Sequence, residues 1–137
     1  MQIIYICRNT EVMETLFQYS NKLINETDIR FVRYMYHNIN WQNRLVGLIG
    51  PRGVGKTTMV LQYIKMNLPI NQTLYITAED FYFAKNRLLD LADAFVKNGG
   101  KYLFIDEIHK YPDWSKELKL MYDYYKDLKV VFTGSSV

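Results

Sequence analysis

A glycine-rich stretch near the middle of the chain constrains the fold more than any other feature. Residues 50–58 read GPRGVGKTT, and the first eight match the phosphate-binding loop pattern G-x-x-x-x-G-K-[ST] without a gap. Gly50, Gly53 and Gly55 allow φ values closed to other residues, so that successive backbone N–H groups can curl around a phosphate. In such a loop Lys56 reaches the β- and γ-phosphates and the Thr57 hydroxyl is a Mg²⁺ ligand. The candidate nucleotide-binding residues are therefore Gly50, Pro51, Arg52, Gly53, Val54, Gly55, Lys56, Thr57 and Thr58.

The residues on either side of this loop are those that the motif requires. Residues 44–49 (RLVGLI) form an apolar run of strand length, and after Lys56 apolar residues recur at helical spacing until Pro69. A helix that begins at the loop also directs its positive dipole end at the phosphate. The alternative, a glycine-rich turn with a chance lysine, fits this strand, loop and helix poorly. We interpret Arg52 as a solvent-exposed member of the loop rather than a phosphate ligand.

The rest of the chain alternates apolar strand-like runs with helical patterns, which predicts an α/β fold with a parallel sheet covered on both faces. Besides residues 44–49, the predicted strands are 73–77, 101–105 and 129–133, and the predicted helices are 56–67, about 86–97 and 113–125. Gly99 and Gly100 are expected to end the second of these helices.

Residues 1–40 are interpreted as an N-terminal helical lead-in, and residues 41–137 as the core. One lead-in helix is expected after a cap at Thr10, and a second one from near Asp28. The residues expected on the buried faces of these helices are Met13, Leu16, Phe17 and Ile24 in the first, and Val32, Met35, Tyr36 and Ile39 in the second.

Composition indicates one soluble globular domain. The chain has 137 residues, of which 49% are hydrophobic and 23% charged. A formal net charge of +3 suits an anionic nucleotide without requiring nucleic acid. The single cysteine, Cys7, excludes an internal disulfide and suits a reducing compartment. Because no apolar run has membrane-spanning length and the N-terminus does not resemble a signal peptide, we expect a cytoplasmic protein.

A second motif lies about 50 residues after the first. Residues 102–107 read YLFIDE, four apolar residues followed by two acids. Asp106 is expected at the carboxyl end of its strand, where ligands bind in open α/β sheets, and where it can hold the Mg²⁺ of a nucleotide, through water. Glu107 points elsewhere and can act as the general base on the attacking water. The alternative is an acidic turn that caps the next helix.

Glu107 separates two groups of phosphate-loop proteins. Kinases and GTPases usually lack this glutamate, whereas hydrolases that couple ATP turnover to motion usually have it, with an extra strand between the two motif strands. Residues 129–135 (KVVFTGS) fit that extra strand. Thr133 near its end is a candidate sensor of the attacking water or the γ-phosphate, and the alternative is an ordinary strand exit.

Together these segments resemble one group of prokaryotic AAA+-type ATPases, in which a C-terminal domain of uncharacterised function follows the ATPase core. The resemblance rests on GPRGVGKTT, LYITAED and LLDLADAFVKNGGKYLFIDEIHKYPDWSKELKLMYDYYKDLKVVFTGSS, within roughly residues 40–136. It implies ATP as the nucleotide and a P-loop NTPase three-layer α/β/α sandwich with sheet order 5-1-4-3-2. By position it implies that Lys56 and Thr57 are phosphate and Mg²⁺ ligands, Asp106 the metal holder, Glu107 the base and Thr133 the sensor.

The resemblance also sets an expectation for the end of the chain. Val137 comes just after the fourth strand, so the family's fifth strand, helical lid, arginine finger and C-terminal domain have no counterpart here. The first strand is then expected to present an apolar edge open to self-association or to a protein partner. Turnover is expected to be slow, because a missing arginine finger costs about 10³–10⁵ in rate in related NTPases.

Two other functions remain open at this point. One is a regulatory switch in which nucleotide orders the domain and hydrolysis is incidental. The other is a nucleic-acid helicase, because His109 completes a D-E-I-H box. Only one strand–helix unit separates the two nucleotide motifs, which leaves little room for helicase motifs, so we favour a helix-entry or supporting role for His109. Four lysines are more typical of a solvated face than of a DNA track: Lys116, Lys119, Lys126 and Lys129.

Aromatic and acidic residues near the expected site have simpler interpretations. Trp41 and Trp114 are expected to be core anchors, and Asp80 a helix cap rather than a site residue. Since the segment before the first strand often contacts the base in this fold class, three residues are weak candidates for flanking adenine: Tyr36, Asn40 and Trp41.

Overall fold

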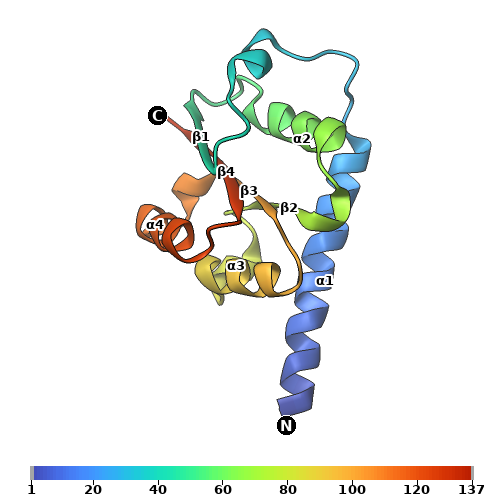
Figure 1. Cartoon of the computed structure of the whole chain (residues 1–137), viewed down its shortest axis with the longest axis vertical. Coiled ribbons are helices and arrows are strands. Elements are labelled where there is room, and N and C mark those ends of the chain that lie inside the picture. Colours follow the sequence, from blue (N-terminus) through green and yellow to red (C-terminus); the bar gives the residue numbers. More distant parts are fainter. Residues whose placement is uncertain (1, 137) are drawn as a thin grey trace.

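Four parallel strands form the single sheet of this protein in the computed structural model, which describes the backbone of residues 2–136 and the side chains of residues 13–136 (Figure 1). The strands are β1 (Leu45–Gly50), β2 (Thr73–Thr77), β3 (Tyr102–Asp106) and β4 (Lys129–Ser135), in the order β1-β4-β3-β2. Every pair is parallel. The part of the predicted order 5-1-4-3-2 that these four strands can form, 1-4-3-2, is confirmed for the described residues.

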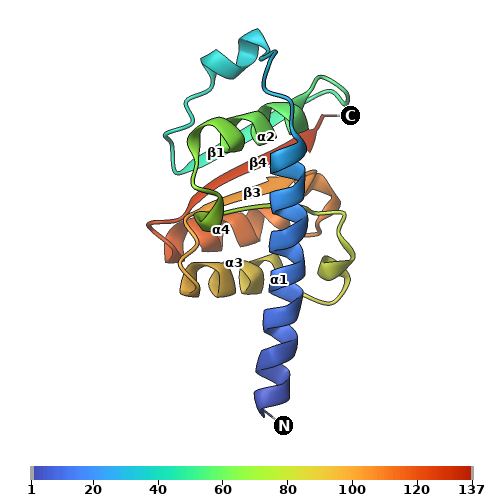
Figure 2. The same ribbon diagram turned by 90° about the vertical axis from the view of Figure 1, so that its right-hand side faces the viewer.

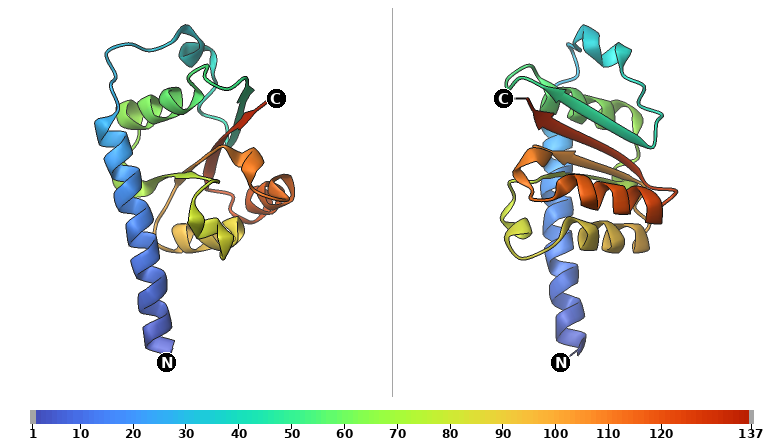
Figure 3. Two further views of the ribbon diagram at one scale, coloured as in Figure 1. Left: turned by 180° about the vertical axis from the view of Figure 1, so that it is seen from behind. Right: turned by 90° about the vertical axis from the view of Figure 1, so that its left-hand side faces the viewer.

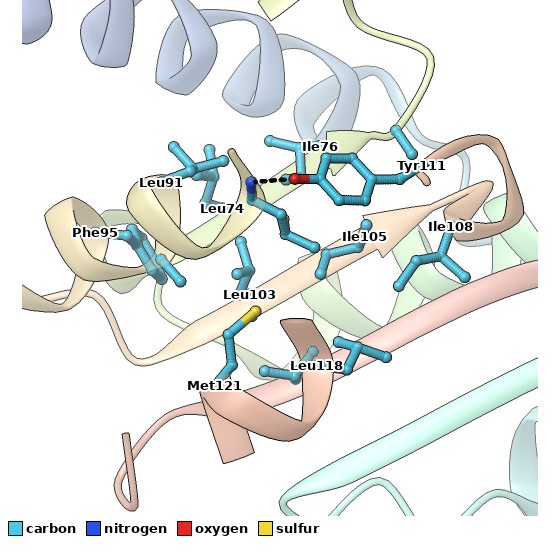
Figure 4. Close-up of a cluster of buried hydrophobic side chains, with 14 of the residues drawn as sticks. Leu74, Ile76, Leu91, Phe95, Leu103, Ile105, Ile108, Tyr111, Leu118 and Met121 are labelled. Carbon is cyan, nitrogen blue, oxygen red and sulfur yellow. Dashed lines mark hydrogen bonds between the residues drawn. The ribbon is translucent and has the colours of Figure 1, made fainter. Parts of the chain in front are cut away.

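Helices cover both faces of this sheet, which confirms the three-layer α/β/α arrangement (Figure 2). The helices that follow the strands are α2 (Lys56–Asn67), α3 (Leu88–Lys97) and α4 (Trp114–Tyr124). Strand side chains alternate between two cores, because successive residues of a strand point to opposite faces. Figure 4 shows Leu74, Ile76, Leu103 and Ile105 turned toward α3 and α4, whereas Tyr75, Phe104 and Val131 pack with α2.

The helix α1 (Gln2–Glu26) covers the outer edge of β2, as two further views show (Figure 3). The buried Ser20 hydroxyl accepts a hydrogen bond from the Tyr75 N–H at 2.9 Å. This backbone N–H lies on the edge of β2 that faces away from β3, and α1 thus supplies its hydrogen-bond acceptor. Leu16 packs in the core on one face of the sheet and Ile24 in the core on the other. The helix begins at Gln2, so the expected start after Thr10 is wrong; the Thr10 side chain lies outside the described ones.

The second lead-in helix predicted from near Asp28 is also wrong. Its residues follow an extended path with one short 3₁₀ helix, η1 (Tyr34–Asn38). Polar side chains of α2 hold this path: the Gln62 amide donates to the carbonyls of Asp28 (3.0 Å) and Phe31 (2.7 Å). Lys65 holds the preceding turn in the same way through the carbonyls of Asn25 and Thr27, both at 2.8 Å.

Replacement of Gln62 by Leu should destabilise the chain by about 1–2 kcal/mol, because it removes two hydrogen bonds of a side chain that is only 3% exposed. Urea unfolding followed by circular dichroism measures this loss. The exposed Gln42 provides the control, since Gln42→Leu should change stability by no more than about 0.5 kcal/mol. Equal stability of the two variants would mean that the segment is not held by α2.

Short 3₁₀ helices complete the fold. They are η2 (Ile70–Gln72), η3 (Phe81–Ala84) and η4 (Ile108–Lys110). The predicted cap at Asp80 and the predicted end of α3 at Gly99 and Gly100 are both confirmed. The Asp80 carboxylate caps η3 by accepting from the Tyr82 N–H at 2.8 Å. Gly99 takes φ +89° and Gly100 donates to the Phe95 carbonyl at 2.8 Å, which ends α3 as expected. Between residues 2 and 136, no helix is both long and apolar enough to cross a membrane.

Candidate functional site

The glycine-rich loop connects the end of β1 to the first residue of α2. Gly53 (φ +80°) and Gly55 (φ +91°) adopt the left-handed conformation that glycine permits, and Gly55 is the N-cap of α2. Gly50 was expected to need a backbone conformation closed to other residues, but its φ is not positive. A Cβ added at Gly50 would meet only Val54, at 4.0 Å. The loop geometry therefore depends on its last two glycines.

Lys56 folds back into this loop. Its ammonium donates to the carbonyls of Gly50 at 2.7 Å and Pro51 at 2.8 Å, and the residue is buried. An ammonium has three donors, so at least one remains for another acceptor. The positive charge lies beside the backbone that the glycines curve and beside the N-terminal end of α2.

Asp106, at the carboxyl end of β3, is the point where the loop and the sheet meet. The Thr57 hydroxyl donates to Asp106 Oδ2 at 2.7 Å. Two further hydroxyls donate to the same carboxylate, Tyr75 to Oδ2 at 2.5 Å and Thr133 to Oδ1. Burial, together with the neighbouring Asp106 charge, raises the pKa of Tyr75, so its phenol remains a donor. Sequence reasoning missed Tyr75, which resembles any apolar residue of a buried strand.

The donor set around Asp106 fits Mg²⁺. A hydroxyl and a carboxylate are hard oxygen ligands, and Mg²⁺ is usually held by one or two such groups together with water and substrate phosphates. No group of three or more His, Cys, Asp or Glu side chains capable of holding a metal occurs among the residues that the structure describes. The site therefore offers a partial coordination shell that phosphate oxygens would complete.

Glu107 adopts a left-handed conformation (φ +55°) that is uncommon for a residue with a side chain. Its N–H donates to the Thr133 hydroxyl at 3.0 Å, which helps to hold the residue there. Its Oε2 is buried without a hydrogen bond to any described residue, but lies 3.3 Å from His109 Nε2. Since His109 Nδ1 accepts from the Ser135 N–H at 3.1 Å, the neutral imidazole carries its proton on Nε2, facing Glu107.

Thr133 lies between the two acidic residues. Its hydroxyl accepts from the Glu107 N–H and donates to Asp106, and the residue is 1% exposed. Ser135, two residues later on the same strand, lies opposite Gly50 and has a buried hydroxyl with no hydrogen-bond partner in residues 13–136. Strand alternation places Ser135 on the same face as Thr133.

A cavity of about 430 Å³ adjoins the loop on the side of the segment that precedes β1. From that segment it is lined by Arg33, Met35 and Ile39 rather than by the expected Tyr36, Asn40 or Trp41. Its remaining lining comes from β1, the loop and α2: Gly47, Leu48, Ile49, Gly50, Pro51, Val54, Lys56 and Met59.

The two tryptophans are packing residues. Trp41 is buried and stacks on Tyr63 with ring centroids 4.2 Å apart, and its Nε1 donates to the Tyr36 carbonyl. Trp114 is half-buried beside Phe132, at 5.7 Å between ring centroids. Trp41 is therefore a core anchor, as predicted. Arg52 is exposed, which agrees with its interpretation as a solvated loop residue.

Two of the comparisons with known proteins gave a match. Among solved structures the chain is similar to that titled "Structure of C. elegans PCH-2", with 17% identity and a TM-score of 0.49. The match covers 93% of this chain and 37% of that one, so this chain spans well under half of that protein. No curated protein matches the chain. Residues 42–137 match the family described as "AAA domain". Because that match covers more than half of the chain, the chain belongs to the AAA domain family and carries an ATPase-type nucleotide-binding core.

Proposed function

We propose that this core binds Mg·ATP and, in the complete protein, hydrolyses it to drive a conformational change. One observation carries the proposal, the hydrogen bond of 2.7 Å between the Thr57 hydroxyl and the Asp106 carboxylate. It joins residues 49 positions apart, one at the start of α2 and the other at the carboxyl end of β3. Two Mg²⁺-type ligands thus lie together beside a phosphate-binding loop, where open α/β sheets bind their ligands.

The loop supplies the binding energy for the phosphates in this proposal. The backbone N–H groups of residues 50–58 and the dipole of α2 attract the phosphate chain. Lys56 exchanges its bonds to the Gly50 and Pro51 carbonyls for phosphate oxygens. Thr57 and Asp106 hold Mg²⁺, which when bound neutralises charge on the β- and γ-phosphates.

Glu107 is the proposed general base. Its carboxylate accepts a proton from water, the water oxygen attacks the γ-phosphorus in line, and the bond to the ADP oxygen breaks. Thr133, which touches both Asp106 and Glu107, reports on the γ-phosphate through these two residues. His109 orients the Glu107 carboxylate through its Nε2, which lies 3.3 Å from Oε2.

A nucleotide-dependent switch with little hydrolysis is the second candidate. It is favoured by the internal bonds of Lys56, because the loop has to rearrange when phosphate replaces the two carbonyls. A rearrangement of that kind can serve a regulatory partner without turnover.

We further infer an interaction through β1. Within the described residues this strand pairs only with β4, and Ile49 beside its free edge is 57% exposed. A free apolar edge supports pairing with another strand, from a second copy or from a protein partner. The resemblance described above supports assignment to the prokaryotic AAA+ group with a C-terminal domain, and the lone Cys7 supports a cytoplasmic location.

Lys56→Ala tests nucleotide binding directly. Saturating Mg·ATP, at about 100 times its Kd, should stabilise the parent chain by about 2.7 kcal/mol, which raises the Tm by about 5–10 °C. Lys56→Ala should abolish this rise, whereas Lys126→Ala, at an exposed lysine, should retain it. Chelation of Mg²⁺ should reduce the rise in the parent chain. An unchanged melting curve of the parent chain with Mg·ATP would refute the proposed binding.

A further inference from the structure

Arg33 extends from the segment before β1 onto the phosphate-binding loop. A Cβ built on Gly55 would lie 2.6 Å from Arg33 Nε, 3.2 Å from Cδ and 3.4 Å from Cζ. The arginine side chain therefore occupies the space that any side chain at position 55 would need. Arg33 also lines the cavity that Lys56 lines, so two cationic residues border one space.

The Arg33 guanidinium has no hydrogen-bond or ion-pair partner among the side chains and backbone of residues 13–136. Two other arginines do have partners: Arg30 pairs with Asp28 at 2.7 Å, and Arg44 donates to the Tyr122 carbonyl at 2.7 Å. A guanidinium carries five donors in a planar fork that matches phosphate oxygens. The unpaired Arg33 guanidinium, the buried Lys56 and the N-terminus of α2 together concentrate positive charge at the loop. This charge favours the binding of an anion there.

The path of the backbone fixes this position. Gln62 of α2 holds the Phe31 carbonyl at 2.7 Å, two residues before Arg33. The Arg33 carbonyl itself accepts from the Tyr36 N–H at 3.0 Å, which closes the turn into η1. The guanidinium is thus delivered to the loop by a segment anchored on both sides. In Figure 1 this segment passes over α2 on its way to β1.

We propose that Arg33 is a nucleotide-binding residue that donates to the phosphate chain of a nucleoside di- or triphosphate from outside the loop. The proposal rests on the proposed function, since it requires a nucleotide in the loop. It makes the segment before β1 part of the phosphate site. A guanidinium suits this role better than an ammonium, because its fork can engage two phosphate oxygens at once.

Arg33→Gln in the full chain tests this role, with calorimetric titration of Mg·ATP, Mg·ADP and inorganic tripolyphosphate. Loss of a charge-assisted hydrogen bond should weaken all three ligands by about 10- to 100-fold. Arg33→Lys should retain an intermediate affinity. Arg30→Gln, three residues earlier in the same segment, is the matched control and should bind like the parent chain. Without ligand, the Tm of Arg33→Gln should equal or exceed that of the parent, because an uncompensated cation is removed.

The outcomes separate this inference from the proposed function. If the parent chain binds none of the three ligands, both fail. If the parent chain binds them, Lys56→Ala does not and Arg33→Gln binds normally, only the role of Arg33 is overturned. If Arg33→Gln weakened the binding of Mg·ADP but left the affinity for tripolyphosphate unchanged, Arg33 would contact the nucleotide base instead. That result would also overturn the phosphate contact. Should Arg33→Gln not fold, Arg33→Lys decides, because an affinity equal to the parent's for tripolyphosphate refutes a bidentate contact.

Discussion

Glu107→Gln should bind Mg·ATP as tightly as the parent chain while its ATP turnover falls about 100- to 10,000-fold. The amide is nearly isosteric with the carboxylate, so the left-handed backbone and the bond from the Glu107 N–H to Thr133 persist. An amide nitrogen or oxygen does not take a proton from water at neutral pH, so the proposed base is lost. Single-turnover hydrolysis with the protein in excess over ATP measures this loss even where turnover is slow.

Glu79→Gln is the matched control for this experiment. Glu79 is an exposed acid just after β2, at the same edge of the sheet as Glu107, and should be dispensable for turnover. Equal turnover in Glu107→Gln and the parent chain would refute the role of the base. A parent chain that binds Mg·ATP with strong thermal stabilisation, yet shows no single turnover above Glu107→Gln, would favour the switch.

The core of the site was predictable from the sequence because its signals are local. An apolar run, three glycines and a lysine specify β1, the loop and α2 within a few consecutive residues, and the helix bounds 56–67 agree with Lys56–Asn67. The two acids after the run YLFI likewise place Asp106 and Glu107 at the end of β3. Chain order and handed crossovers then bring these strand ends together.

The remaining contacts of the site come from elements that have no local signature. Arg33 reaches the loop because α2 holds an extended segment by its carbonyls, and such side-chain-to-backbone bonds leave no periodicity in the sequence. The same bonds explain why apolar residues at helical spacing after Asp28 did not form a helix. Tyr75 reaches Asp106 from the neighbouring strand, which requires both the register and the facing of β2. Tertiary contacts, rather than propensity, decide these positions.

Phe95→Ala should cost about 3–5 kcal/mol of stability, the largest loss expected for one side chain in this fold. Phe95 is 0% exposed on α3 and belongs to the core that the sheet, α3 and α4 enclose (Figure 4). Its ring centroid is 5.7 Å from that of Phe17, so its removal also loosens α1. Denaturant unfolding gives the loss, and Phe81→Ala, at a 94% exposed ring, should change stability by no more than about 0.5 kcal/mol.

Gly100 allows a sharper test of the same packing. A Cβ at this position would lie 2.4 Å from Cε1 of Phe95 and 2.5 Å from two other ring atoms, so Gly100→Ala should cost about 1–3 kcal/mol in the parent chain. In the Phe95→Ala background the added methyl group enters the vacated space, so the cost of Gly100→Ala should largely disappear. A double-mutant cycle measures this coupling. Additive losses would show that the ring does not occupy the space against Gly100, and that the end of α3 is packed differently.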